Sequence, residues 1–254
     1  MASDPDFMLS LARGLSVIRT FGQGKPRLSI REIALSTGLS RAAARRCVHT
    51  LSVLGYASGS DGVYELTPAT LTLAANYLGS TSLARAANPI LERLSAELHE
   101  STAAAVLDGD EVLFVALAAA RRIVSVTVAV GSRLPAVASA MGRVLIANLD
   151  ESVRQRVLGR VKLTRHTPRT IVDKAEFRAE LDRIRSQGYA LVDQELELGL
   201  RSLAVPVTGP GRRVLAAICV GVHAARADRH TLVREFLPPL QRAALDLASS
   251  VHRA

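Results

Sequence analysis

The first fifty-odd residues carry three short runs in which apolar residues recur at helical spacing. The run Leu11–Phe21 predicts a first helix. The segment Ser29–Glu32 has the serine and glutamate of a capping box, which predicts the start of a second helix. After a break at Gly38, Ser40 is placed to cap a third helix that runs to about Leu54. We expect the inner face of this third helix to hold Ala44, Cys47, Val48, Leu51 and Leu54.

A two-stranded hairpin is predicted directly after the three helices. Residues 56–58 and 63–66 are short strand-like runs, and Asp61-Gly62 between them favours a tight turn. Three helices followed by a hairpin are the order of a winged helix-turn-helix. Thr67-Pro68 then predicts the start of a linker helix. We therefore expect a DNA-binding domain over residues 1–66, a linker helix over 67–79 and a second domain over 80–254.

The second domain mixes strand and helix patterns, which predicts an α+β fold. Its predicted helices lie near residues 83–100, 139–148, 151–158, 174–187 and 231–251. Its predicted strands lie near residues 103–107, 112–117, 123–130, 189–193, 203–207 and 214–222. The segment 131–135 is expected to be a loop that leads into the helix beginning near Ser139.

Basic residues are concentrated in the N-terminal part of the chain. The 254 residues carry a formal charge of +9. Between Met8 and Ser60 there are eight arginines and lysines but one acidic residue, Glu32. Such a segment suits a phosphate backbone, because binding releases condensed counterions. From charge alone, a solvated basic surface explains the segment equally well.

The third predicted helix has the polar groups needed to read DNA. A recognition helix buries one face and presents the other to the major groove, where arginine can bind guanine through two hydrogen bonds. We expect Ser40 to touch phosphate rather than a base, and the hairpin to follow the minor groove or the backbone. The alternative is a helical bundle whose arginines face water, and His49 alone is best explained as a surface residue. The residues predicted to contact double-stranded DNA are Ser40, Arg41, Ala42, Arg45, Arg46, His49 and Tyr64.

Cysteine usage and the absence of targeting patterns indicate a cytoplasmic protein. Cys47 and Cys219 each lie in an apolar stretch and look like small buried residues of a protein in a reducing compartment. The first residues lack the pattern of a signal peptide, and no apolar run is long enough to span a bilayer. We therefore expect no membrane partner.

Six stretches over nearly the whole chain carry a family resemblance. They are Ser10–Ile18, Gly38–Ala43 with Arg46 and Thr50-Leu51, Leu54–Tyr56, Leu134-Pro135, Ser139–Arg143 and Asp193–Val207. Together they resemble the IclR family of bacterial transcriptional regulators. The sequence around Met141–Arg143 is most similar to the branch of the family that controls the breakdown of aromatic acids. The genes controlled by that branch belong to the protocatechuate, 4-hydroxybenzoate and β-ketoadipate pathways.

The resemblance implies a GAF-like α+β effector-binding domain, a small organic acid as effector, and a homodimer formed partly through the DNA-binding half, possibly a dimer of dimers. A two-fold dimer would read an inverted-repeat operator. Carried over one position at a time, the resemblance implies the pocket residues Ala140, Met141, Asp193, Leu200, Ser202, Cys219 and Gly221. Cys219 and Gly221 stand where the family can have serines, which leaves room for a larger and more apolar ligand.

The residues themselves are compatible with a carboxylate effector. Main-chain N–H groups at a helix start near Ser139 would favour a carboxylate, and Arg133 just before it could add charge-assisted hydrogen bonds. The simpler interpretation is that Met141, Leu200 and Cys219 pack the core and that Arg133 is solvated.

An enzyme acting on a small organic acid is the alternative from another class. The six histidines are scattered and form no metal-ligand pair, and the chain has no G-x-S-x-G nucleophile motif. Glu195 and Glu197 could act as general acid and base, although carboxylates beside a glycine loop are more often capping or ion-pair groups. We therefore expect no catalytic residues, no metal and no cofactor. Whether the protein activates or represses is left open by the sequence.

Overall fold

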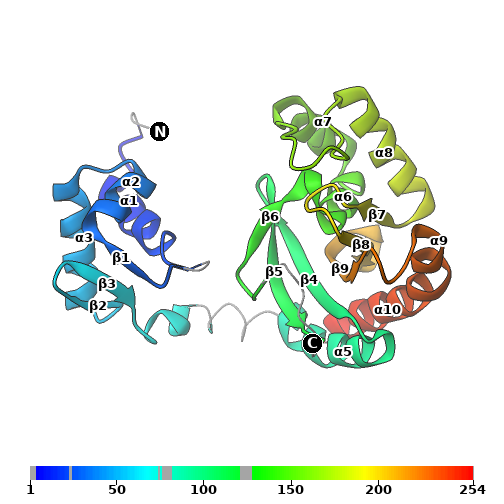
Figure 1. Cartoon of the computed structure of the whole chain (residues 1–254), viewed down its shortest axis with the longest axis horizontal. Coiled ribbons are helices and arrows are strands. Elements are labelled where there is room, and N and C mark those ends of the chain that lie inside the picture. The colour runs from blue at the N-terminus through cyan, green and yellow to red at the C-terminus, as the bar shows by residue number, and fades with distance from the viewer. Residues whose placement is uncertain (1–3, 23–24, 74, 76–81, 121–127, 254) are drawn as a thin grey trace. The chain divides into compact units, whose positions relative to one another are not determined.

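The chain folds as two compact units, Met1–Ser80 and Thr81–Ala254, in the computed structural model (Figure 1). The structure describes residues 4–22, 25–73, 75, 82–120 and 128–253. Residues 70–73 of the predicted linker helix are helical, and most of the linker after them lies outside the described residues.

The N-terminal unit is three helices beside a three-stranded antiparallel sheet. The elements in chain order are α1 (Leu9–Ile18), β1 (Arg27–Ser29), α2 (Ile30–Thr37), α3 (Arg41–Val53), β2 (Ala57–Ser60) and β3 (Val63–Leu66). The predicted capping box is present, because the Ser29 hydroxyl accepts from the Glu32 N–H and the Glu32 carboxylate accepts from the Ser29 N–H at 2.9 Å. Gly38 ends α2 with φ +69°, a left-handed conformation that glycine adopts at no steric cost.

Two features of this unit differ from the sequence-based expectation. The strand β1 was not predicted; it pairs with β3, so that the sheet order is β1-β3-β2. Leu54, expected on the inner face of the third helix, is 62 % exposed, because its side chain lies at the open groove between α1 and α3 and not in the core. Val48 and Leu51 are buried as expected.

The C-terminal unit contains a six-stranded antiparallel sheet with the order β6-β5-β4-β9-β8-β7. The strands are β4 (Ser101–Asp108), β5 (Glu111–Ala118), β6 (Arg133–Pro135), β7 (Ala190–Asp193), β8 (Leu200–Thr208) and β9 (Val214–His223). The helices are α5 (Ser82–Leu98), α6 (Ala140–Ala147), α7 (Glu151–Arg160), α8 (Lys174–Gln187), α9 (Arg229–Thr231) and α10 (Leu237–Arg253), with short helical turns at Ala136–Ala138, Pro210–Arg212 and Leu232–Phe236. The expected loop at residues 131–135 therefore contains an edge strand, which pairs with β5. The strand expected over residues 123–130 lies mostly outside the described residues.

Helices cover both faces of this sheet and create two cores (Figure 1). Successive strand residues point to opposite faces. On β9, Ile218 and Val220 therefore pack with α5 and α10, whereas Ala217 and Cys219 face α6. The side of the sheet covered by α6, α7 and α8 carries the site described below.

The turn that leads into α6 is packed so closely that it requires glycine at one position. A Cβ atom on Gly142 would lie 2.1 Å from the carbonyl oxygen of Ala136, well inside any allowed contact. Gly159 on α7 differs, because a Cβ atom there would meet nothing within 4 Å.

Alanine at these two glycines should therefore have opposite effects. We expect Gly142→Ala to lower the free energy of unfolding by about 1–3 kcal/mol, the usual cost of overpacking a core. Gly159→Ala should raise it by up to about 1 kcal/mol, because alanine favours a helix over glycine. Urea unfolding followed by circular dichroism measures both. Equal stabilities for Gly142→Ala and wild type would show that the turn can relax.

Candidate functional site

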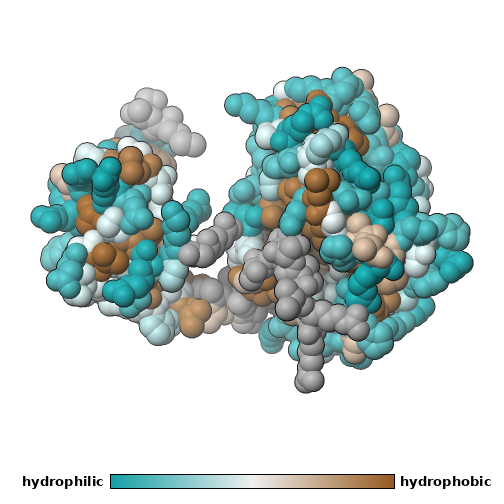
Figure 2. Space-filling view, viewed as in Figure 1, coloured by the Kyte–Doolittle hydropathy of each residue, from teal (hydrophilic) through white to brown (hydrophobic). Residues whose placement is uncertain are grey.

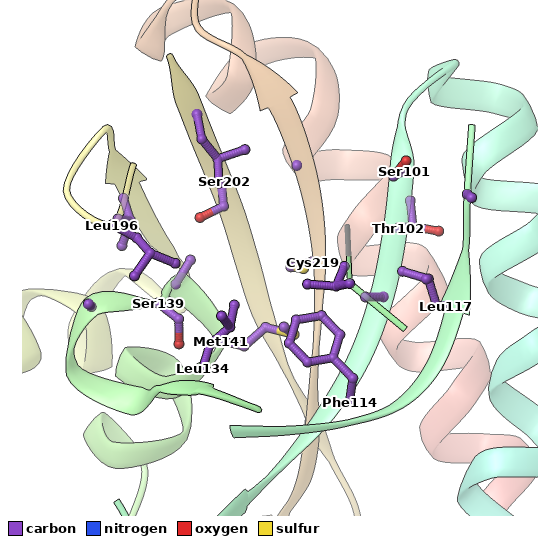
Figure 3. Close-up of a pocket in the computed structure, with 18 of the residues that line it drawn as sticks. Ser101, Thr102, Phe114, Leu117, Leu134, Ser139, Met141, Leu196, Ser202 and Cys219 are labelled. Atoms are coloured by element: carbon purple, nitrogen blue, oxygen red, sulfur yellow. The ribbon is translucent and has the colours of Figure 1, made fainter. Parts of the chain in front are cut away.

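A cavity of about 320 Å³ lies on the α6 side of the C-terminal sheet (Figure 3). This volume is near the lower end of small-molecule sites, which span about 300–1,000 Å³. Most of the lining is apolar, including Phe114, Leu117, Leu134, Met141 and Leu196. The size and walls suit one small, mainly apolar molecule.

Small residues in neighbouring strands leave the space for this cavity. Gly221 of β9 lies between Ser101 of β4 and Ser202 of β8 in the strand register. Two residues earlier on β9, and therefore on the same face of the sheet, Cys219 lies between Ala103 and Ala204. Two adjacent rows of small side chains cannot fill the layer beneath α6, so a hollow remains between sheet and helix.

The N-terminus of α6 supplies hydrogen-bond donors at the wall of the cavity. The first N–H groups of a helix have no partner within it. Here the Gly142 N–H is bound by the Ser139 hydroxyl at 3.1 Å and the Arg143 N–H by the Ser139 carbonyl at 3.0 Å. Ala140 and Met141, which line the cavity, are the first two residues of α6, so their N–H groups have no carbonyl partner within the helix. The helix dipole adds partial positive charge there, so this wall favours an anion.

The hydroxyl groups around the cavity are not equally available. Ser101 accepts from the Ala120 N–H at 3.1 Å, and Thr102 donates to the Leu91 carbonyl at 2.9 Å. Among the hydrogen bonds of the described residues, none involves the hydroxyl of Ser202. Figure 3 shows Ser202 directed toward the cavity. It is therefore the hydroxyl best placed to bind a polar group of a ligand.

Six of the eight predicted effector residues line this one cavity: Ala140, Met141, Leu200, Ser202, Cys219 and Gly221. Burial raises the pKa of the Cys219 thiol to about 12. The thiol therefore stays neutral near pH 7 and forms an apolar wall rather than a nucleophile.

Arg133 is a correction to the sequence-based site. Its guanidinium binds Glu111 at 3.1 Å and also Asp108, and the hydrogen bond to Asp108 raises the pKa of Arg133 further. It is not among the lining residues, and within the described residues the cavity lining has no charged side chain. Among the described residues, the groups at the cavity that can hold an anion are therefore main-chain N–H and hydroxyl groups.

Asp193 also lies outside the cavity. Its carboxylate binds Arg201 Nε at 2.7 Å and Arg169 Nη1 at 3.3 Å. Burial alone would raise the pKa of Asp193, but the hydrogen bonds from Arg201 and Gln194 outweigh that effect and lower it. Its ion pair with Arg201 joins the end of β7 to the start of β8.

The sequence-based site missed Phe114, Leu117, Leu134 and Leu196. They come from β5, β6 and the loop after β7, and only the three-dimensional pairing of these elements brings them to one cavity. All four are apolar, and in a sequence an apolar residue that lines a ligand pocket looks the same as one that packs in the core.

In the N-terminal unit, most of the predicted DNA-contact residues lie on α3, whereas Ser40 precedes it as the N-cap and Tyr64 lies on β3. Five of them are exposed on α3: Arg41, Ala42, Arg45, Arg46 and His49. Ser40 is exposed, and its hydroxyl caps α3 by accepting from the Ala43 N–H at 3.2 Å. Tyr64 is half-buried and packs against the core of the unit. Arg46 also lines a groove between α1 and α3.

Comparison with known families covers both units. The model of the bacterial transcriptional regulator IclR C-terminal domain matches residues 75–249, and that of the IclR helix-turn-helix domain matches residues 10–59. The chain is an IclR-family transcriptional regulator. This confirms the predicted family and the winged helix-turn-helix plus α+β effector domain, and it does not support the enzyme alternative. Among the described residues, no helix of this regulator is long and apolar enough to cross a membrane.

Relatives of this IclR-family regulator are found among proteins of known role. The Pca regulon regulatory protein of Pseudomonas putida is 47 % identical over 96 % of this chain and 84 % of its own length. The p-hydroxybenzoate hydroxylase transcriptional activator of Acinetobacter baylyi is 34 % identical over 97 % and 93 %. A crystal structure of an IclR homologue from Microbacterium hydrocarbonoxydans, complexed with 4-hydroxybenzoate, is 29 % identical and superposes with a TM-score of 0.82 over 96 % of this chain and 100 % of that one.

Proposed function

We propose that this regulator binds a single-ring aromatic acid in the cavity beneath α6 and controls genes for the breakdown of such acids. The observation that carries the proposal is a small, mostly apolar cavity whose wall includes the first two residues of α6 and whose described lining has no charged side chain. The 4-hydroxybenzoate complex of the Microbacterium homologue supports this ligand class, and the p-hydroxybenzoate hydroxylase activator supports the class of genes.

The ligand would lie with its carboxylate at the start of α6 and its ring between the apolar walls. The N–H groups of Ala140 and Met141 would bind the carboxylate, where the helix dipole adds to the attraction. Phe114 and Cys219 would contact the ring, and the Ser202 hydroxyl would bind a ring substituent. Each of these residues lines the cavity.

Filling the cavity should abolish effector binding without unfolding the domain. A Cβ atom on Gly221 would make only an ordinary contact, 3.8 Å from Leu200, so valine should fit the strand and occupy ligand space. In wild type, 4-hydroxybenzoate at about 100 times its Kd should stabilise the protein by about 2.7 kcal/mol. Gly221→Val should keep its own melting temperature but lose this ligand-dependent rise.

Arg133→Ala is the control for that experiment, because Arg133 lies outside the cavity and should leave the ligand-dependent shift unchanged. An undiminished shift in Gly221→Val would place the ligand elsewhere. No shift in wild type with any hydroxybenzoate would overturn the proposed ligand class.

For DNA recognition, we infer that the exposed face of α3 enters the major groove. This face carries Arg41, Arg45 and His49 beside the small Ala42, while Ser40 is available to phosphate through its remaining hydrogen-bonding capacity. Tyr64 would contribute only at the edge of the wing, because it is half-buried.

Removing an arginine from this face should weaken operator binding and its dependence on salt. For Arg41→Ala and Arg45→Ala, loss of one phosphate contact should flatten the log–log salt slope by about one unit, whereas loss of a base contact should cost about 1–3 kcal/mol and relax specificity. Fluorescence anisotropy over a salt series separates the two. Arg242→Ala, an exposed arginine of α10, is the control. Wild-type affinity and slope in both variants would exclude α3 as the recognition helix.

We further propose that a second copy of the chain covers the groove between α1 and α3. This groove exposes Leu11 (58 %), Leu15 (46 %) and Leu54 (62 %) together, and apolar side chains are visible among hydrophilic ones on this unit in Figure 2. Contiguous exposed apolar surface marks an interaction site. A two-fold dimer would present two recognition helices to an inverted-repeat operator; the proposal leaves open whether two dimers associate further.

A charge in this groove should weaken the dimer. Leu11→Glu would bury a carboxylate at the interface, so we expect the dimer Kd to rise by about tenfold or more. The matched control is Leu35→Glu on α2, because Leu35 is 74 % exposed and lies outside the groove. Sedimentation equilibrium measures both. An unchanged Kd in Leu11→Glu would remove this groove from the interface, and a monomeric wild type would remove the dimer.

A further inference from the structure

A buried ion pair connects α6 to the loop that follows β7. Arg143 is 1 % exposed, and its two terminal nitrogens donate to Glu195 Oε1 at 2.7 Å and Oε2 at 2.6 Å. Its Nε donates to the Val137 carbonyl at 2.7 Å, and its guanidinium lies 5.6 Å from the ring centroid of Phe177. The guanidinium of Arg143 is therefore held by three neighbours, namely Glu195, the Val137 carbonyl and the ring of Phe177.

Glu195 is held equally firmly on its other side. Its Oε2 accepts from the Ile171 N–H at 3.0 Å, and its main-chain carbonyl accepts from the Thr170 hydroxyl at 2.6 Å. Thr167 donates to the neighbouring Gln194 carbonyl at 2.7 Å. Thr167 and Thr170 therefore hold the main chain of the loop. The Glu195 carboxylate links the loop to α6 through its two hydrogen bonds with Arg143.

The loop between these contacts is short and closed on itself. Gln194 has φ +60°, its N–H donates to the Leu200 carbonyl at 2.8 Å, and its side-chain oxygen accepts from the Gly199 N–H at 3.1 Å. Because the ends of the loop are held together, the position of Glu195 also determines the position of the next residue, Leu196. Leu196 lines the cavity, on the same side as Ser139 at the start of α6 (Figure 3).

Stability alone is a weak explanation for this pair. Replacing a buried ion pair by well-packed apolar residues is often neutral or stabilising, because desolvating two charges offsets much of their attraction. The pair instead fixes how α6 and the loop after β7 lie relative to each other, because a bidentate arginine–carboxylate contact sets both distance and orientation. The residues that it fixes relative to each other, Leu196 and Ser139–Met141, are walls of one cavity.

We propose that Arg143 and Glu195 are positioning residues that hold Leu196 against the cavity and so set the size of acid that the site accepts. The part concerning the acid rests on the proposed function, whereas the part concerning Leu196 does not. Neither side chain of the pair lines the cavity, so both act through the residues beside them.

The position of Leu196 can be measured without any ligand, because the chain contains no tryptophan. Leu196→Trp places a single fluorophore in the cavity wall, and Leu198→Trp places one in the same loop at a residue that is 59 % exposed. In each background the pair is replaced by Arg143→Met with Glu195→Met, which leaves no unpaired buried charge. Acrylamide quenching should rise severalfold for Trp at 196 and stay the same at 198, while the melting temperature is retained.

The exposed pair Arg242–Glu97 provides the control substitution, Arg242→Met with Glu97→Met, which should alter quenching at neither position. Should the double methionine protein fail to fold, Arg143→Met with Glu195→Gln tests the same point, because it removes both charges and the bidentate contact while the glutamine oxygen can still accept from the Ile171 N–H. Unchanged quenching at 196 in a folded protein that lacks the pair would overturn the proposal.

The second measurement compares two acids in the protein with native Leu196. Calorimetric titration gives the Kd of 4-hydroxybenzoate and of the longer 4-hydroxycinnamate. Loss of the pair should shift the ratio of the two Kd values by about tenfold in favour of the longer acid, the scale of discrimination that a methylene-sized change in an apolar pocket provides. A purely structural role would weaken both acids together and leave the ratio unchanged, which would contradict a role in selectivity. If wild type binds neither acid, the proposed ligand class fails, while quenching at 196 still decides the role of the pair.

Discussion

The tight reversal between β6 and α6 is the constraint on which the effector domain depends. Gly142 lies against the main chain of Ala136 with no space for a Cβ atom, and this contact fixes where α6 begins. The helix therefore starts above strands whose side chains are small at Gly221 and Cys219. The placement of α6 by this reversal brings its first N–H groups to the wall of the cavity and leaves the cavity itself between the helix and the small side chains of the sheet.

Much of the fold could be predicted because its signals are local. The Ser29–Glu32 capping box, the glycine at 38 and five of the six strands predicted for the effector domain each depend on neighbours within a few residues, and the described residues contain them. The short strands β1 and β6 were missed for the opposite reason. A three-residue strand has too few residues for alternation, and only its partner in the sheet makes it a strand.

The error over Arg133 follows directly from the missed strand β6. As a loop residue before a helix, Arg133 looked free to turn toward a ligand. Pairing of β6 with β5 sets Arg133 opposite Leu113. Its guanidinium there forms ion pairs with Asp108 and Glu111, on either side of the β4–β5 turn. The ion pair of Arg143 with Glu195 was beyond sequence reasoning for a related reason, since 52 residues separate partners that only the packing of α6 against the loop brings together.

The donors at the start of α6 have a consequence for how this site changes over evolutionary time. They are main-chain N–H groups, and every residue except proline carries one. A substitution at Ala140 or Met141 other than proline therefore keeps the N–H donor, whereas the side chains of the apolar walls, that of Met141 included, set the shape of the cavity. If the site binds an acid as proposed, recognition of its negative charge would tolerate mutation better than recognition of its shape, and related proteins would diverge mainly in the rest of the molecule that they bind.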